Sequence, residues 1–199
     1  MALTASTTNI DICARALVMI GASPISSFDD GTTEATVASN TYEDTVRADL
    51  SMMRWRFASG QVQLSRLTDT PAGRFDAAYQ LPSDLLNLHT VTINDNILSY
   101  DRYEDMVYCN AASGDVLIAD YTYRADESSW PPYFILLAQY HMAATFAASV
   151  ARSGDMQNLF LQQYVSQMRL AKNLDSQEQT ARKIPTNRFA RFRNSTSTS

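Results

Sequence analysis

The segment WPPYFILLAQYHMAATFAASVARSG, from Trp130 to Gly154, constrains the fold of this chain more than any other. It is nearly apolar on every side of a helix and dense in alanine, and a helix of that kind is surrounded by other elements. Pro132 suits the first turn of a helix, where its missing N–H needs no partner. The segment therefore predicts a central, closely packed helix that ends near Gly154.

A first amphipathic helix is predicted from about residue 9 to residue 20. Thr8 is a suitable N-cap, and Asp11 three residues later completes an approximate capping box. Gly21 follows the last apolar position and supplies a C-terminal stop. The helix is therefore predicted to begin and end on local signals.

Two further helices are predicted, one from Glu34 to Gly60 and one capped by Asp155 that ends near Ala181. In both, apolar residues recur at steps of three and four, while the opposite face is polar. The predicted buried stripes are Ala35, Ala38, Tyr42, Val46, Leu50, Met53 and Phe57 in the first of them, and Met156, Phe160, Tyr164, Met168 and Ala171 in the second.

Between these helices, residues 62–128 show the turn signals and the alternation of strands. Asp95 and Asn96 separate two strand-like runs and predict a hairpin, and Ser113-Gly114-Asp115 is a second turn signal. The predicted fold class is α+β. Four helices would pack as two helical hairpins, with an antiparallel β-meander or small barrel inserted between the second and third helices and an extended C-terminal arm.

This reading divides the 199 residues into four parts. Residues 1–60 form an N-terminal helical hairpin, and residues 61–128 form a β-rich insertion. Residues 129–181 form a C-terminal helical hairpin that makes one helical domain with 1–60. Residues 182–199 form an extended arm.

The arm, RKIPTNRFARFRNSTSTS, differs in charge from the rest of the chain. It holds five basic residues and no acid, which leaves 21 acidic against 11 basic residues elsewhere, a net charge of −10. The rest of the chain, which we call the body, therefore repels a phosphate backbone at long range. Three interpretations of the arm remain open from its composition alone: a segment that binds nucleic acid, a segment that docks on a protein partner, or a tail with no binding function.

Composition also limits the compartment and the chemistry. Cys13 and Cys109 indicate no disulfide framework, no secretory signal or membrane span is expected, and glycine-rich phosphate loops are absent. His89 reads as a packing or surface residue, and His141 as a satisfied core histidine rather than a general base. The acidic clusters, Asp101, Glu104 and Asp105 and then Asp126 and Glu127, read as solvated charge. We therefore predict no catalytic residue, cofactor or metal, and no enzyme.

Four separated segments together are similar to one family. They are LVMIGASPISSFDD, LSMMRWRFA, YQLPSDLL and the passage YTYRADESSWPPYFILLAQYHMAATFA into the alanine-rich helix. The residues that match are Leu17, Ile20, Gly21, Pro24, Ser27, Asp29, Trp55, Phe57, Tyr79, Leu81, Pro82, Asp84, Leu86, Arg124, Asp126, Trp130, Pro131 and Phe134. The chain resembles the tail tubular protein A group, the head-to-tail adaptors (connectors) of short-tailed bacteriophages.

The resemblance implies a structural virion protein of the head–tail junction, assembled in the host cytoplasm and without membrane contact. Such adaptors form a homo-oligomeric ring, typically of twelve copies, beneath the portal protein. The ring extends the channel for genome ejection, lets double-stranded DNA pass without specific binding, and offers a platform to the next tail protein, a nozzle or tube. An acidic body suits such a channel because it does not hold phosphates.

Two sets of residues are predicted to make these contacts. In related adaptors the C-terminal segment commonly reaches the portal, so the docking residues here would be Arg182, Lys183, Ile184, Pro185, Arg188, Phe189, Arg191, Phe192 and Arg193. The candidates for contacts between subunits, on the polar face of the second helix, are Glu43, Asp44, Arg47 and Arg54. The alternative function is a nucleic-acid-binding module that acts through the arginines and phenylalanines of the arm.

Overall fold

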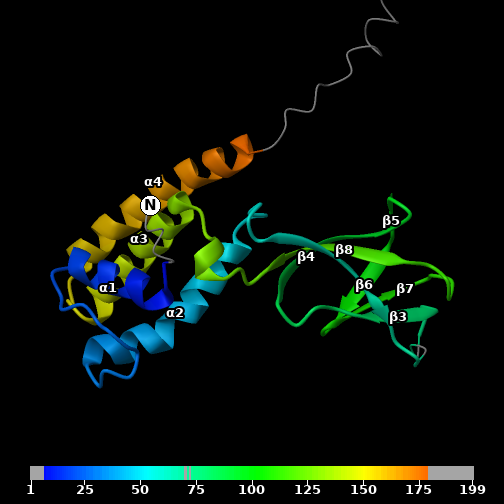
Figure 1. The fold of residues 1–199 in the computed structure, drawn as a ribbon, viewed down its shortest axis with the longest axis horizontal. Coiled ribbons are helices and arrows are strands. Elements are labelled where there is room, and N and C mark those ends of the chain that lie inside the picture. The colour runs from blue at the N-terminus through cyan, green and yellow to red at the C-terminus, as the bar shows by residue number, and fades with distance from the viewer. Residues whose placement is uncertain (1–6, 70, 72, 179–199) are drawn as a thin grey trace, which may run out of the picture.

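The structure is a computed structural model that describes residues 7–69, 71 and 73–178. The predicted docking residues 182–193 lie outside the described residues. Figure 1 shows the helices gathered into one unit and the strands into a second unit beside it. The segments that follow α2 and precede α3 connect the two units.

The described helices are α1 (Asn9–Met19), α2 (Thr33–Ser51), α3 (Pro132–Ser149) and α4 (Gly154–Gln177). The capping box predicted for α1 is confirmed, since the Thr8 side chain accepts from the backbone of Asp11 while the Asp11 carboxylate accepts from the backbone of Thr8. Local capping signals therefore locate the start of this helix correctly.

The alanine-rich helix α3 is central, as predicted. It packs against α1, α2 and α4, and buried residues lie on all its sides. The second predicted helical hairpin, α3 with α4, is present. The first is not: α1 packs mainly on α3 and only slightly on α2. The reason is that α3 offers an apolar surface all round, whereas α2 has a single apolar stripe.

Helix α2 ends at Ser51 and not at Gly60, so its predicted length is wrong. The first five residues of the predicted stripe are buried in it, but Met53 and Phe57 lie beyond its end. Tertiary hydrogen bonds hold this non-helical stretch: Trp55 Nε1 donates to the Asp49 carbonyl (2.9 Å), and the Arg56 amide donates to Asp175 Oδ1 (3.0 Å). These bonds depend on contacts that periodicity cannot report.

The strand unit consists of two antiparallel sheets of four strands each. Their orders are β1-β8-β4-β5 and β2-β3-β7-β6. The strands are β1 (Ser59–Gln63), β2 (Ser65–Arg66), β3 (Ala77–Gln80), β4 (Leu85–Ile93), β5 (Asn96–Ile97), β6 (Tyr100–Tyr103), β7 (Met106–Cys109) and β8 (Leu117–Tyr123), and a short 3-10 helix, η1 (Glu127–Ser129), precedes α3.

These sheets overturn the predicted fold class of a four-helix packing with an inserted meander or small barrel. Strand β1 pairs with β8, far away in the sequence, and β7 and β8 lie in different sheets although a turn connects them. The predicted hairpin is confirmed between β4 and β5, with its turn at Asn94 and Asp95, both at positive φ. Alternation reveals the buried face of a strand but not the identity of its neighbours.

Each unit has its own core. The core of the helical unit includes Leu17, Val46, Trp55, Leu137 and Phe146, and the two sheets enclose a smaller one of Leu64, Ala77, Tyr79, Leu81, Val91, Val107, Cys109, Leu117 and Ala119. The chain therefore holds two separate apolar cores, joined by the short segments on either side of the strand unit.

Candidate protein-interaction site

The outer face of the sheet β2-β3-β7-β6 carries large apolar side chains that belong to neither core. In β7, Val107 and Cys109 point into the strand core and are buried. Met106 and Tyr108 therefore point to the opposite face, because side chains alternate along a strand. Tyr103 of β6 lies opposite Met106 in the antiparallel register, and it is 49% exposed.

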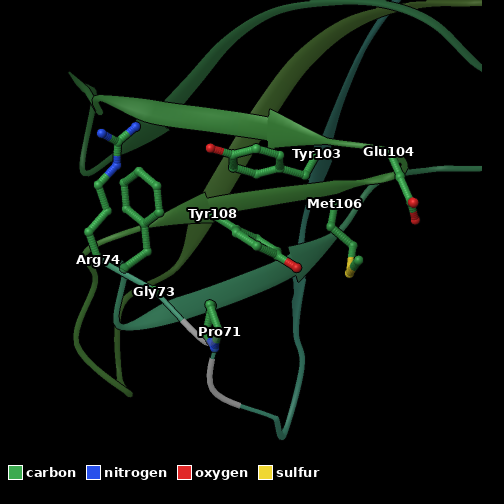
Figure 2. Close-up of a pocket in the computed structure, with 8 residues that line it drawn as sticks. Pro71, Gly73, Arg74, Tyr103, Glu104, Met106 and Tyr108 are labelled. Carbon is green, nitrogen blue, oxygen red and sulfur yellow. The ribbon is translucent and has the colours of Figure 1, made fainter.

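These residues line a groove, which is shown in Figure 2. The ring centroids of Tyr103 and Tyr108 are 5.2 Å apart, and Phe75 meets Tyr108 edge-on at 6.5 Å. Pro71 and Gly73 also line the groove, which has a volume of about 570 Å³. Three aromatic rings therefore lie next to one another at the surface, with Met106 beside them.

Charged groups stand at the rim of this groove. The Arg74 guanidinium lies over the Phe75 ring at 5.1 Å from its centroid and forms an ion pair with Asp101. Glu104 stands at the other side, at the turn between β6 and β7, with a positive φ of 55°. Tyr, Met and Arg are the side chains most enriched in protein–protein interfaces. The composition therefore favours recognition of a protein segment.

This groove was not predicted from the sequence, in which Asp101, Glu104 and Asp105 read as solvated charge and neither tyrosine stands out. A signal was present: in MVYC the residues alternate between two faces, and both faces carry large apolar side chains. A strand with two apolar faces covers one core and leaves a second surface for another contact.

A second exposed apolar surface lies on α4. Its exposed apolar side chains lie along the two edges of the buried stripe, because a helix turns by about 100° per residue: Leu159, Leu170 and Leu174 on one edge, and Leu161 and Val165 on the other. Arg169 and Lys172 are exposed on the same helix. The buried residues of α4, among them Tyr164, Met168 and Ala171, face α3 as predicted. This helix therefore has exposed apolar side chains on both edges of its core stripe.

The two units are joined by a polar network centred on Arg124, between β8 and η1. Its guanidinium donates to Glu127 Oε1 (2.7 Å) and to Glu43 Oε2 of α2 (3.0 Å), and lies over the Trp130 ring at 5.6 Å. The Tyr42 hydroxyl donates to the same Glu127 oxygen (2.8 Å). Burial opposes the charge of Arg124, but these two carboxylates outweigh it and raise the pKa of the guanidinium.

An aromatic cluster lies below this network. The Phe134 ring is fully buried, with centroid distances of 5.1 Å to Trp55, 4.9 Å to Phe57 and 4.8 Å to Trp130. Leu86, which follows the sequence YQLPSD, packs against the same core. Residues from the second, third and fourth of the segments that carry the family resemblance therefore meet at the junction between the two units.

The predicted inter-subunit candidates have partners within the chain, with one exception. Glu43 pairs with Arg47 (2.7 Å) and with Arg124, and hydrogen bonds from both arginines lower the pKa of Glu43 against the opposing effect of burial. The Nη2 atom of Arg54 lies 3.8 Å from Oδ2 of Asp120. Asp44 is exposed, and no ion pair involves it among the described residues. Glu43 and Arg47 thus belong at least partly to the junction.

The two histidines occupy the environments that the sequence suggested. His141 Nδ1 lies 2.9 Å from Oδ1 of the fully buried Asp49, and the Tyr164 hydroxyl donates to the same oxygen (2.8 Å). His141 therefore has a buried partner, as expected, but its side chain is 23% exposed and lies at the edge of the core. His89 Nε2 lies 2.8 Å from Thr122 Oγ1, and burial lowers the pKa of His89.

Within residues 7–69, 71 and 73–178, no cluster of three or more His, Cys, Asp or Glu side chains could hold a metal ion. Nor does any helix in that part of the chain have the length and apolar character needed to cross a membrane. A scan against models of known protein families gave no match, and a search of curated proteins gave none either.

Proposed function

We propose that this chain is a structural adaptor of a bacteriophage head–tail junction, which forms a ring beneath the portal and carries the next tail protein. The resemblance in four sequence segments is the starting point for this proposal. An adaptor of this kind needs one surface for the component above, another for the component below, and a rigid body between them.

The observation that carries the proposal is the presence of exposed interface-like surfaces on both units, which the Arg124 network joins. The groove of Tyr103, Tyr108 and Phe75 lies on the strand unit, and the exposed leucines lie on α4 of the helical unit. In Figure 1, the strand unit lies beside the helical unit, so the groove and α4 belong to different parts of the molecule and suit different partners.

Contacts between copies in a ring are heterologous, so each copy needs two different complementary surfaces. The edge of α4 that carries Leu161 and Val165 also carries Arg169 and Lys172, so it suits an acidic surface, and the rest of the body is strongly acidic. We assign α4 to the contact between neighbouring copies, the groove to the next tail protein, and residues 182–193 to the portal. The virion is the corresponding location.

The assignment of the arm is tested by truncation. A chain that ends at Ala181 is expected to fold, because the described helices and strands end before that residue, but to lose attachment to heads that carry the portal. A chain that ends at Asn194 lacks only the last five residues and serves as the control, with attachment expected to be retained. Normal attachment of the shorter chain would contradict the assignment, as would equal loss in both.

A further inference from the structure

We propose that, before a partner is bound, the basic arm of the chain occupies the aromatic groove of its own strand unit. The occupant is the segment from Arg182 to Arg193, and the groove is the one formed by Phe75, Tyr103, Met106 and Tyr108. This inference concerns the free protein and goes beyond the proposed function, because the contact itself requires neither portal nor tail protein.

Charge and side-chain type match between the segment and the groove. The arm has five basic residues and no acid, together with Ile184, Phe189 and Phe192. The strand unit, residues 59–123, has nine acidic and three basic residues, and the exposed Glu104 and Asp105 stand beside the groove. Phenylalanines can stack on the exposed tyrosines while the flanking arginines pair with the acids.

The segment is also long enough to reach the groove. The last turn of α4 lies beside the start of the strand unit, because Asp175 accepts from the amide of Arg56. From there the path along β1 and β2 and across two strands to β7 is about 36 Å, at about 3.3 Å per residue and 4.8 Å per strand. Phe189 is eleven residues beyond Glu178 and Phe192 is fourteen, which span up to about 38 Å and about 49 Å when extended.

A contact within one chain is favoured over a contact between copies. A segment tethered by a linker of this length experiences an effective concentration of the order of millimolar at a site it can reach. Two consequences rest on the proposed function. The bound arm blocks access of the next tail protein to the groove, and the groove keeps the arm bound until the portal displaces it. Engagement of the portal would then expose the platform.

The contact can be measured in the full chain by paramagnetic broadening. Ser195→Cys provides an attachment point for a nitroxide just beyond the segment, and Cys13 and Cys109 do not compete because both are buried. With methionine methyl groups carrying ¹³C, the Met106 signal reports on the groove, and the Met19 signal of α1 reports on the helical unit. Broadening of Met106 but not of Met19 is expected.

Variants and mixing identify the cause of the broadening. Tyr103→Ser, at a half-exposed position, should restore the Met106 signal, whereas Ile97→Ser on the other sheet should not. In a mixture of ¹³C-labelled chains without nitroxide and unlabelled chains with nitroxide, Met106 should stay sharp. An unbroadened Met106 in the tagged chain would overturn the proposal, and so would broadening of equal size in the mixture, which would show an exchange of arms between copies.

Discussion

Replacement of Arg124 by glutamine should destabilise the protein far more than its surface charge suggests. Its side chain is 16% exposed, and it is the only cation in the described network that contacts both Glu43 of α2 and Glu127 of the segment after β8. Without it, Glu127, 17% exposed, retains only the hydrogen bond from Tyr42. Arg124→Gln therefore leaves a carboxylate that is mostly buried and poorly compensated.

The size of the effect follows from burial. A hydrogen bond to a charged group contributes about 1.5–3 kcal/mol when it is shielded from water, and removal of one partner of a buried ion pair costs about 3–5 kcal/mol. The Glu43 contact adds little, because that side chain is 48% exposed and keeps Arg47 as a partner. We expect a loss of about 2–4 kcal/mol in the free energy of unfolding.

Arg47→Gln is the matched control, because Arg47 pairs with the same Glu43 but is 53% exposed. An exposed i,i+4 pair contributes about 0.3–0.5 kcal/mol, so this variant should remain close to the wild type. The assay is urea unfolding followed by tryptophan fluorescence. Both tryptophans of the chain, Trp55 and Trp130, are buried at the junction, so the signal reports on it directly.

Two results would refute this reasoning. If the free energies of unfolding of the two variants differ by less than about 0.5 kcal/mol, burial does not distinguish the two arginines. If Arg124→Gln is strongly destabilising but adding Glu127→Gln to it makes no difference, the loss does not come from the uncompensated carboxylate. The expected result is partial recovery in the double variant.

Three further predictions concern the helical unit. Phe134→Ala should lower the free energy of unfolding by about 3–5 kcal/mol, measured in urea, because it opens a cavity among three aromatic rings. Asp49→Ala should lower the free energy of unfolding by about 1–3 kcal/mol or more, because the Tyr164 hydroxyl and the His141 ring lose the Asp49 oxygen that they share. Asp49→Asn should lower it less, and equal losses in the two variants would contradict the role of the carboxylate. Burial raises the pKa of the Cys13 thiol to about 12, so this thiol should react with a thiol reagent only when the protein unfolds. Its reactive thiolate fraction grows as the pH rises. A fast reaction of Cys13 in the native protein at pH 8 would contradict its burial.

Helical periodicity predicted the presence of all four described helices, and capping located the start of α1, because these signals are local; the predicted cap of α4 was wrong, since its N-cap is Ser153 and not Asp155. Thr8 and Asp11 cap α1, and the apolar surface of α3 requires neighbours on all sides. The end of α2 could not be predicted in the same way. No glycine or proline lies between Glu34 and Gly60, and the helical spacing continues through Phe57, but the chain leaves the helix after Ser51, where contacts such as the bond from the Arg56 amide to Asp175 hold it.

The arrangement of the strands was beyond local patterns for a similar reason. The β4–β5 hairpin was predicted correctly from its turn residues. The pairing of β1 with β8 joins residues on either side of the whole strand unit, and only the three-dimensional packing determines it. The division into two sheets could therefore not be read from turn signals.

The candidate site was the least predictable part. Glu43 and Arg47 read as free surface charge, but Arg124, more than 70 residues away in the sequence, draws Glu43 into the junction. Tyr103 and Tyr108 become neighbours because β6 and β7 pair, and Phe75 joins them from the segment before β3. Each of these arrangements depends on tertiary contacts.

The central claim is that this chain is a head-to-tail adaptor that assembles on a portal. Electron microscopy of the purified protein mixed with purified portal rings of the matching phage tests it most directly. The account predicts an added ring of density coaxial with the portal, with a continuous central channel. Portal rings without added density, with the protein remaining as separate particles at saturating concentration, would contradict it.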